Sequence, residues 1–205
     1  MEELFSSYRT LKSRSEAIYT EQRSKFIAFA IPVESEEVAM EEIQELRKRY
    51  YDARHVCWAY RIGKGEPIER QNDDGEPSST AGKPILGQMF SYQLTDLLIV
   101  VVRYFGGVKL GTGGLIVAYR TAAEEAIKNS EIVEVILYSY YRLTFPFDLI
   151  NPVMMLLRQY EAETVFNDAD TEGHIWEIKV PNSRAREFEE GASAIYQLQI
   201  KGVTN

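Results

Sequence analysis

The chain has 205 residues, of which 45% are hydrophobic and 26% charged, which is the composition of an ordinary globular protein with one domain or two small ones. Its formal net charge of −8 argues against unspecific binding to phosphate backbones, and we expect no DNA partner. The sequence contains no run of eighteen apolar residues, so no membrane span is predicted. The N-terminus lacks the apolar core of a secretory signal, and the lone cysteine excludes an intrachain disulfide. We therefore expect a cytoplasmic protein.

The first part of the chain predicts three strands and a helix. Residues 15–21 and 25–33 are expected to form strands, and the second of these is rich in aromatic and β-branched residues. Residues 34–51 follow as a helix with an apolar stripe at helical spacing, and Ser35 is placed to cap it. Residues 54–62 are the third predicted strand.

A long polar stretch, residues 63–84, comes next. It holds three prolines and four glycines and is too long for an idle connection in a compact domain, so we predict a functional loop. A short helix is predicted at 85–92 and a buried strand at 96–105. A helix with small apolar residues along one face is predicted at 113–129.

Residues 135–205 have a different order of predicted elements. They read as strand, helix, two strands, helix and strand, over residues 135–147, 148–160, 162–170, 173–181, 183–196 and 197–202. This βαββαβ order is the ferredoxin-like plan. The fold class is therefore α+β, with one domain at 1–134 and a ferredoxin-like domain at 135–205, joined by a very short linker.

The glycine-rich turn "RYFGGVKLGTGGL", residues 103–115, lies between the predicted buried strand and a helix. Backbone N–H groups at a helix N-terminus favour anions, so the turn predicts an anion or nucleic-acid site. Its candidate residues are Arg103, Gly106, Gly107, Lys109, Gly111, Gly113, Gly114 and Arg120. The alternative is that the glycines only permit a tight turn and close packing. A P-loop is excluded because no GK[ST] occurs, and a dinucleotide fingerprint fails because Ile116 replaces its third glycine.

The acidic stretch "NDDGEPSSTAGKP", residues 72–84, is the second candidate. Asp73, Asp74 and Glu76 have the chemistry to bind a cation such as Mg²⁺ or to act as acid–base groups. The EF-hand spacing fails because Arg70 stands where its first Asp belongs. The alternative is a structural turn, because Asp, Ser and Thr side chains commonly bond to nearby backbone. We assign no metal and no cofactor.

His55 and Cys57 alternate along the predicted strand 54–62 and therefore share one face. One His and one Cys do not make a metal site, and His174 lies in the other predicted domain. A structural or binding role for His55 is favoured, and we predict no catalytic residue.

Four segments carry a family resemblance: "SKFIAFAIPV", "ARHVCWAYRI", "NDDGEPSSTAGKPIL" and "VVVRYFGGVKLGTGGLIVAY". They resemble the IMPACT family, and the βαββαβ tail resembles its bacterial two-domain, YigZ-type branch. The resemblance implies that the first domain has the α/β sandwich fold of a ribosomal-protein domain that is also found in elongation factor G. It also implies that the tail is similar to the ferredoxin-like domains of that factor. Ser79 stands where the family frequently has glycine, so a stiffer loop is expected.

The resemblance also implies a function. Eukaryotic members regulate translation by antagonising the activation of an initiation-factor kinase, and no catalytic residues are established in the family. The positions that match the family motifs imply a binding surface, whose rim consists of His55, Asp73, Asp74, Gly75, Glu76 and Thr80 beside the glycine-rich turn.

The sequence therefore predicts a translation-associated regulatory or binding protein. Its groove, between the acidic stretch and the glycine turn, is expected to face the ribosome, RNA or a translation-related protein. One alternative is an enzyme acting on a phosphorylated small molecule, which a closed pocket with converging acid–base groups would favour. The other is a protein-binding adaptor, which an exposed apolar patch would favour.

Overall fold

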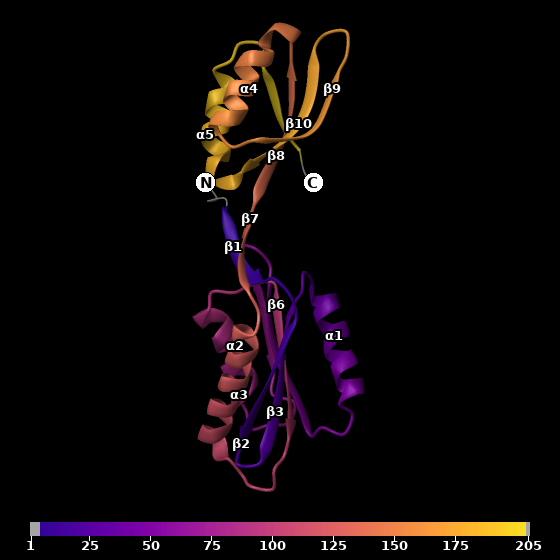
Figure 1. The fold of residues 1–205 in the computed structure, drawn as a ribbon, viewed down its shortest axis with the longest axis vertical. Helices are drawn as coiled ribbons and strands as arrows, with labels where there is room; N and C mark the ends of the chain where they lie inside the picture. Colours follow the sequence, from indigo (N-terminus) through magenta and orange to yellow (C-terminus); the bar gives the residue numbers. More distant parts are fainter. Residues whose placement is uncertain (1–4, 204–205) are drawn as a thin grey trace. The chain divides into compact units, whose positions relative to one another are not determined.

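The structure, a computed structural model, describes residues 5–203; the first four residues of the N-terminal segment considered above lie outside this range. The chain divides into two compact units. One is Arg9–Glu134, and the other runs from Val135 onward and includes the N-terminal residues that end at Tyr8. Both units mix helices and strands (Figure 1).

The unit Arg9–Glu134 is built on a five-stranded antiparallel sheet with the order β2-β3-β6-β4-β5. Its strands are β2 (Ser15–Glu21), β3 (Ser24–Pro32), β6 (Leu97–Tyr104), β4 (His55–Ile62) and β5 (Ile68–Asn72). Its helices are α1 (Glu36–Arg49), α2 (Gly82–Ser91) and α3 (Gly111–Lys128).

Helices cover both faces of this sheet. In Figure 1, α2 and α3 lie on one side of it and α1 on the other. The central strand β6 alternates between the two cores: Ile99 and Val101 pack in the α2/α3 core, whereas Leu98 and Val100 pack in the α1 core. A strand that is buried on both faces must be apolar at nearly every position, which explains the run "LLIVVV". The predicted α/β sandwich is confirmed.

Two predicted helix features are also confirmed. Ser35 is the N-cap of α1 and its side chain accepts a hydrogen bond from the backbone N–H of Val38. The small face of α3, including Leu115 and Ala118, is buried against the sheet.

Four predicted boundaries were wrong. Residues 63–84 are not one loop, because β5 pairs with β4 inside this stretch. All five β5 residues are exposed, so this edge strand lacks the apolar alternation that reveals a strand. Helix α2 begins at Gly82 rather than residue 85, and α3 begins at Gly111 rather than residue 113.

The fourth correction concerns residues 135–147. They do not form one strand, because β7 (Ile132–Ile136) ends before β8 (Tyr138–Phe145) begins. Strand β1 (Ser7–Leu11), with which β7 pairs in a separate two-stranded sheet, was not predicted from the sequence.

The second unit has the ferredoxin-like fold predicted for it. Its elements are β8, η1 (Phe147–Leu149), α4 (Ile150–Gln159), β9 (Glu163–Ala169), β10 (His174–Pro181), α5 (Asn182–Ser193) and β11 (Gln199–Val203). They form an antiparallel sheet of order β11-β8-β10-β9, in which the first and third strands of the βαββαβ order are central. Leu143, Ile178 and Phe188 are fully buried between this sheet and its helices.

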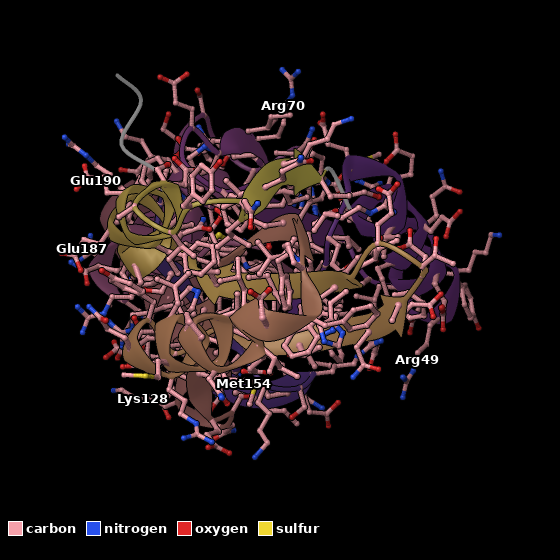
Figure 2. All side chains as sticks on the ribbon, turned by 90° about the horizontal axis from the view of Figure 1, so that it is seen from above. Arg49, Arg70, Lys128, Met154, Glu187 and Glu190 are labelled. Atoms are coloured by element: carbon pink, nitrogen blue, oxygen red, sulfur yellow. The ribbon has the colours of Figure 1, made fainter. Side chains whose placement is uncertain are left out.

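The surface is rich in charged side chains. Arg49 and Arg70 extend away from the ribbon in Figure 2. None of the helices within residues 5–203 is both long enough and apolar enough to cross a bilayer.

One glycine of the turn after β6 is required by close backbone contact. A Cβ on Gly106 would lie 2.1 Å from the carbonyl carbon of Arg23, and the Gly106 N–H is 3.2 Å from the Ser24 hydroxyl oxygen that accepts from it. By contrast, a Cβ on Gly113, inside the first turn of α3, would meet no atom within 4 Å. The close-packing interpretation therefore applies to Gly106 and not to Gly113.

We predict that Gly106→Ala lowers the free energy of unfolding by about 1–3 kcal/mol or more, because the backbone of the β2–β3 turn must move away. The matched variant Gly113→Ala should be neutral or stabilise by up to about 1 kcal/mol, because alanine is the better helix former. Urea unfolding of both variants measures the difference. Equal stability of the two variants would contradict this assignment.

Candidate anion-binding cavity

The acidic stretch and the glycine turn meet at one cavity of about 430 Å³, which we call the loop–turn cavity. It is bounded by the start of β4, the acidic stretch and the turn into α3. The lining residues are Arg54, His55, Gly75, Glu76, Pro77, Arg103, Phe105, Lys109, Leu110, Gly111, Thr112 and Leu115.

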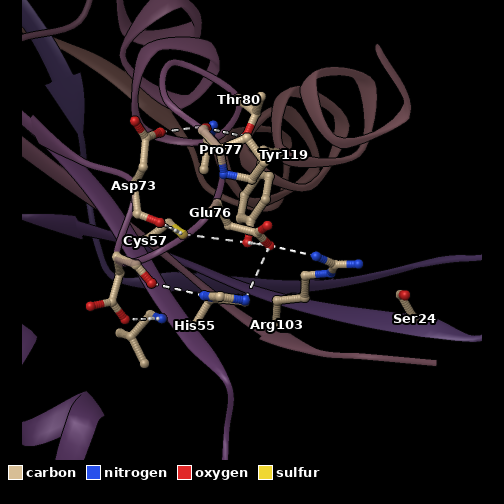
Figure 3. Close-up of polar contacts among 12 residues, drawn as sticks. Ser24, His55, Cys57, Asp73, Glu76, Pro77, Thr80, Arg103 and Tyr119 are labelled. Carbon is tan, nitrogen blue, oxygen red and sulfur yellow. Dashed lines mark hydrogen bonds and ion pairs between the residues drawn. The ribbon is translucent and has the colours of Figure 1, made fainter. Parts of the chain in front are cut away.

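Glu76 lies at the buried side of the cavity and is only 9% exposed. Its Oε1 accepts a hydrogen bond from Arg103 Nη1 at 2.5 Å and another from the Tyr119 hydroxyl at 2.9 Å (Figure 3). His55 Nε2 lies 3.8 Å from the same oxygen. This carboxylate therefore joins the acidic stretch to β6, α3 and β4, with its charge compensated by the guanidinium.

Arg103 is almost completely buried, with 5% exposure, and its position follows from the strand register. In the sheet it is paired with Phe26 on one side and with His55 on the other. The guanidinium carbon lies 5.5 Å from the Phe26 ring centroid and 5.6 Å from that of Phe105, within cation–π distance. Its Nε is buried and has no hydrogen-bond partner among the described residues. Arg103 is thus a structural partner of Glu76 whose Nε remains a buried donor without an acceptor among the described residues.

His55 is held in one orientation by the acidic stretch. Its Nδ1 lies 2.8 Å from the backbone carbonyl oxygen of Asp74 (Figure 3), and because a carbonyl only accepts, Nδ1 must carry a proton. The other ring nitrogen, Nε2, is on the side of Glu76. A neutral His55 therefore presents an acceptor at Nε2, and a protonated one presents a donor.

The carboxylates of Asp73 and Asp74 hold the loop together. Asp73 accepts hydrogen bonds from the backbone N–H groups of Ser79, Ala81 and Gly82, at 2.8, 3.0 and 2.8 Å, and so caps the start of α2. Ser79 itself has a φ of +62°, a left-handed backbone in which glycine is less strained.

Asp74 accepts from the backbone N–H of Val56 and from Arg47 Nη2, both at 2.7 Å. Its side chain therefore ties the loop to β4 and α1.

Within residues 5–203 no group of three or more His, Cys, Asp or Glu side chains is arranged to hold a metal ion. The carboxylates considered for Mg²⁺ or acid–base chemistry are bound to backbone N–H groups or ion-paired instead.

Cys57 and Tyr119 lie beneath the acidic stretch. The thiol sulfur is 3.0 Å from the carbonyl oxygen of Asp73 and 3.3 Å from the Tyr119 hydroxyl. Burial raises the pKa of the Cys57 thiol and that of the Tyr119 phenol well above their ordinary values. Both groups are neutral at physiological pH, and the thiol is not a nucleophile here.

The opposite side of the cavity is the N-terminus of α3. Gly111 and Thr112 belong to its first turn and line the cavity. Leu110, the N-cap residue, offers no side-chain hydrogen bond, and the first turn contains no acidic residue. The positive end of the helix dipole is therefore left without a compensating side chain.

The predicted site residues fall into three groups. His55, Gly75, Glu76, Arg103, Lys109 and Gly111 line the cavity. Asp73, Asp74, Thr80, Gly106, Gly107, Gly113 and Gly114 are absent from its lining, and several of them shape the loops around it. Arg120 lines a different hollow of about 790 Å³, together with Lys83.

Two residues of the cavity lining, Arg54 and Phe105, were not predicted as site residues from the sequence. Arg54 directly precedes β4 and Phe105 directly follows β6. The only signal was that Arg54 precedes His55 and that Phe105 is two residues after Arg103, at the ends of strands that become neighbours.

Most of this chain is similar in sequence to known proteins. Residues 22–127 match the family model of the Impact N-terminal domain. The IMPACT family member YvyE of Bacillus subtilis (strain 168) is 43% identical over 131 residues, which are 64% of this chain and 60% of YvyE. This chain therefore matches less than two thirds of the length of YvyE. The IMPACT family member YigZ of Escherichia coli (strain K12) is 30% identical over 169 residues, 82% of each protein.

Two solved structures are also similar. A crystal structure described as that of a hypothetical protein has a TM-score of 0.67 at 26% identity, covering 98% of this chain and 100% of that one. A structure described as that of the two-domain translational regulator Yih1 is 28% identical and covers 58% of this chain and 48% of its own, with a TM-score of 0.41. The first of these supports the described fold across nearly the whole chain.

We predict that Arg103→Ala lowers the free energy of unfolding by about 3–5 kcal/mol, because Glu76 is then a buried carboxylate without its counter-charge. Lys109→Ala is the matched control, since Lys109 lines the same cavity but is exposed, and its effect should stay within about 0.5 kcal/mol. Guanidinium unfolding measures both. A loss below about 1 kcal/mol for Arg103→Ala would mean that the ion pair contributes little.

Alkaline pH should destabilise the protein through Cys57. Its pKa is raised in the folded chain, so its contribution to stability is complete below the ordinary value of 9.0 and is lost as pH rises above it, when the unfolded thiol ionises. At pH 10 this loss is about 1.4 kcal/mol. Urea unfolding at pH 8 and pH 10 should therefore show a larger fall for the wild type than for Cys57→Ala. Equal falls would contradict the burial of the thiol.

Proposed function

Because this chain belongs to the IMPACT family, we propose that it is a translation-associated regulatory protein that contacts the ribosome or RNA through the loop–turn cavity. We place this activity in the cytoplasm, as the sequence predicts. The family supports the regulatory part of the proposal, since Yih1 is described as a translational regulator.

The local charge of the cavity carries the binding part of the proposal. Among the described residues that line it, Arg54, Arg103 and Lys109 are cationic and Glu76 alone is acidic. The whole chain has a net charge of −8. A local excess of positive charge beside the dipole of α3 is the arrangement that attracts phosphate groups to an otherwise acidic protein.

The two alternative functions receive less support from the site. For an enzyme, acid–base groups should converge in the cavity. His55 and Glu76 do line it, but Glu76 is ion-paired with Arg103, and Asp73 and Asp74 are bound to the backbone and to Arg47. For a protein-binding adaptor, Phe105 and Val108 are exposed beside the cavity, yet charged residues accompany them.

We predict that Arg54→Ala/Lys109→Ala weakens binding to ribosomes, tRNA or short RNA and reduces the slope of log affinity against log salt by about one to two, because two phosphate contacts are lost. Both side chains are exposed and form no ion pair with the other described residues, so we expect the variant to stay folded. Filter binding of labelled RNA at two or more salt concentrations is the measurement.

Lys25→Ala/Lys48→Ala is the matched control, since it removes the same charge from exposed positions on β3 and α1 that do not line the cavity. If both double variants lost affinity equally, binding would follow net charge alone. If the wild type bound none of these partners, the proposal would be wrong.

A further inference from the structure

We infer that the loop–turn cavity takes a phosphate monoester, such as the terminal phosphate of RNA or of a free nucleotide, in preference to the internal phosphodiester backbone. This inference rests on the proposed function in that it assigns the same cavity to phosphate. It goes further than the proposed function because it specifies which kind of phosphate group, a monoester, occupies the cavity.

The charges favour the group with the greater negative charge. Arg54 and Lys109 lie on the cavity wall and form no ion pair with another of residues 5–203, whereas Arg103 compensates Glu76. A phosphate monoester carries a charge of roughly −1.5 to −2 at neutral pH, against −1 for each diester. Two available cations and the positive end of α3 match the monoester better.

The unused donors point to the same group. Arg103 Nε is buried without a partner, and the first turn of α3 has no capping side chain. A buried donor without an acceptor is energetically unfavourable, and a ligand oxygen would relieve it. A monoester offers three terminal oxygens and a diester only two, so the monoester can satisfy more of these donors.

The size of the cavity is also that of a single small ligand. Its volume of about 430 Å³ lies within the usual range of small-molecule pockets, roughly 300–1,000 Å³. One nucleotide-sized group fits this description.

The test is a binding comparison on the full chain by isothermal titration. The first pair of ligands is AMP and 3′,5′-cyclic AMP, which share base and sugar but differ as monoester and diester. The second pair is one short RNA with a 5′-phosphate and the same RNA with a 5′-hydroxyl. We expect the monoester of at least one pair to bind ten-fold or more tightly than its counterpart. Arg54→Ala/Lys109→Ala should reduce this preference, and Lys25→Ala/Lys48→Ala should keep it.

The outcomes separate this inference from the proposed function. RNA binding that ignores the 5′-phosphate, together with equal affinities for AMP and cyclic AMP, would overturn the inference and leave the proposed function standing. Tight AMP binding without RNA or ribosome binding would support the inference, identify a free nucleotide as the source and reject the proposed function. A preference confined to 5′-phosphorylated RNA would support both. No binding of any of these ligands, together with no binding of ribosomes or tRNA in the filter assay, would reject both.

Discussion

The buried contact between Glu76 and Arg103 is the interaction on which the candidate site depends. It joins the acidic stretch to the central strand β6, and Tyr119 extends it to α3. A charge in a low-dielectric interior is tolerated only with a partner at close range, so these elements must keep their relative positions. The cavity exists because this constraint holds the acidic stretch and the glycine turn at a fixed separation.

The same constraint explains why the loop has so many backbone hydrogen bonds. The acidic stretch has no apolar core of its own. It can hold the Glu76 carboxylate in place only if its backbone N–H and C=O groups have hydrogen-bond partners. Asp73 supplies three such bonds and Asp74 ties the loop to β4, while the Asp74 carbonyl fixes the His55 ring. The three acidic residues therefore have different roles: Asp73 and Asp74 stabilise the loop through hydrogen bonds, and Glu76 lines the cavity.

The sequence was sufficient to predict those helices and strands whose buried residues leave a recognisable pattern of apolar positions. The apolar run of β6, the aromatic and β-branched residues of β3 and the small face of α3 predicted these elements, and the βαββαβ order predicted the second unit. The α/β sandwich itself was implied by the family resemblance. The sequence was insufficient for β5, whose residues are all exposed. The pairing of Arg103 with Glu76 was not predicted, because the two residues are 27 positions apart and only the folded chain brings them together. The place of Arg54 on the cavity wall was not predicted either, because it too depends on the folded chain.

The division of the chain has a consequence for how the protein is made. All residues of the unit Arg9–Glu134 are consecutive, so they have been synthesised before Val135 is added, whereas the core of the other unit comes from residues 135–205. Domains generally fold as units in the order of synthesis. The candidate cavity, whose lining ends at Leu115, is therefore complete in a nascent chain that still lacks its ferredoxin-like unit.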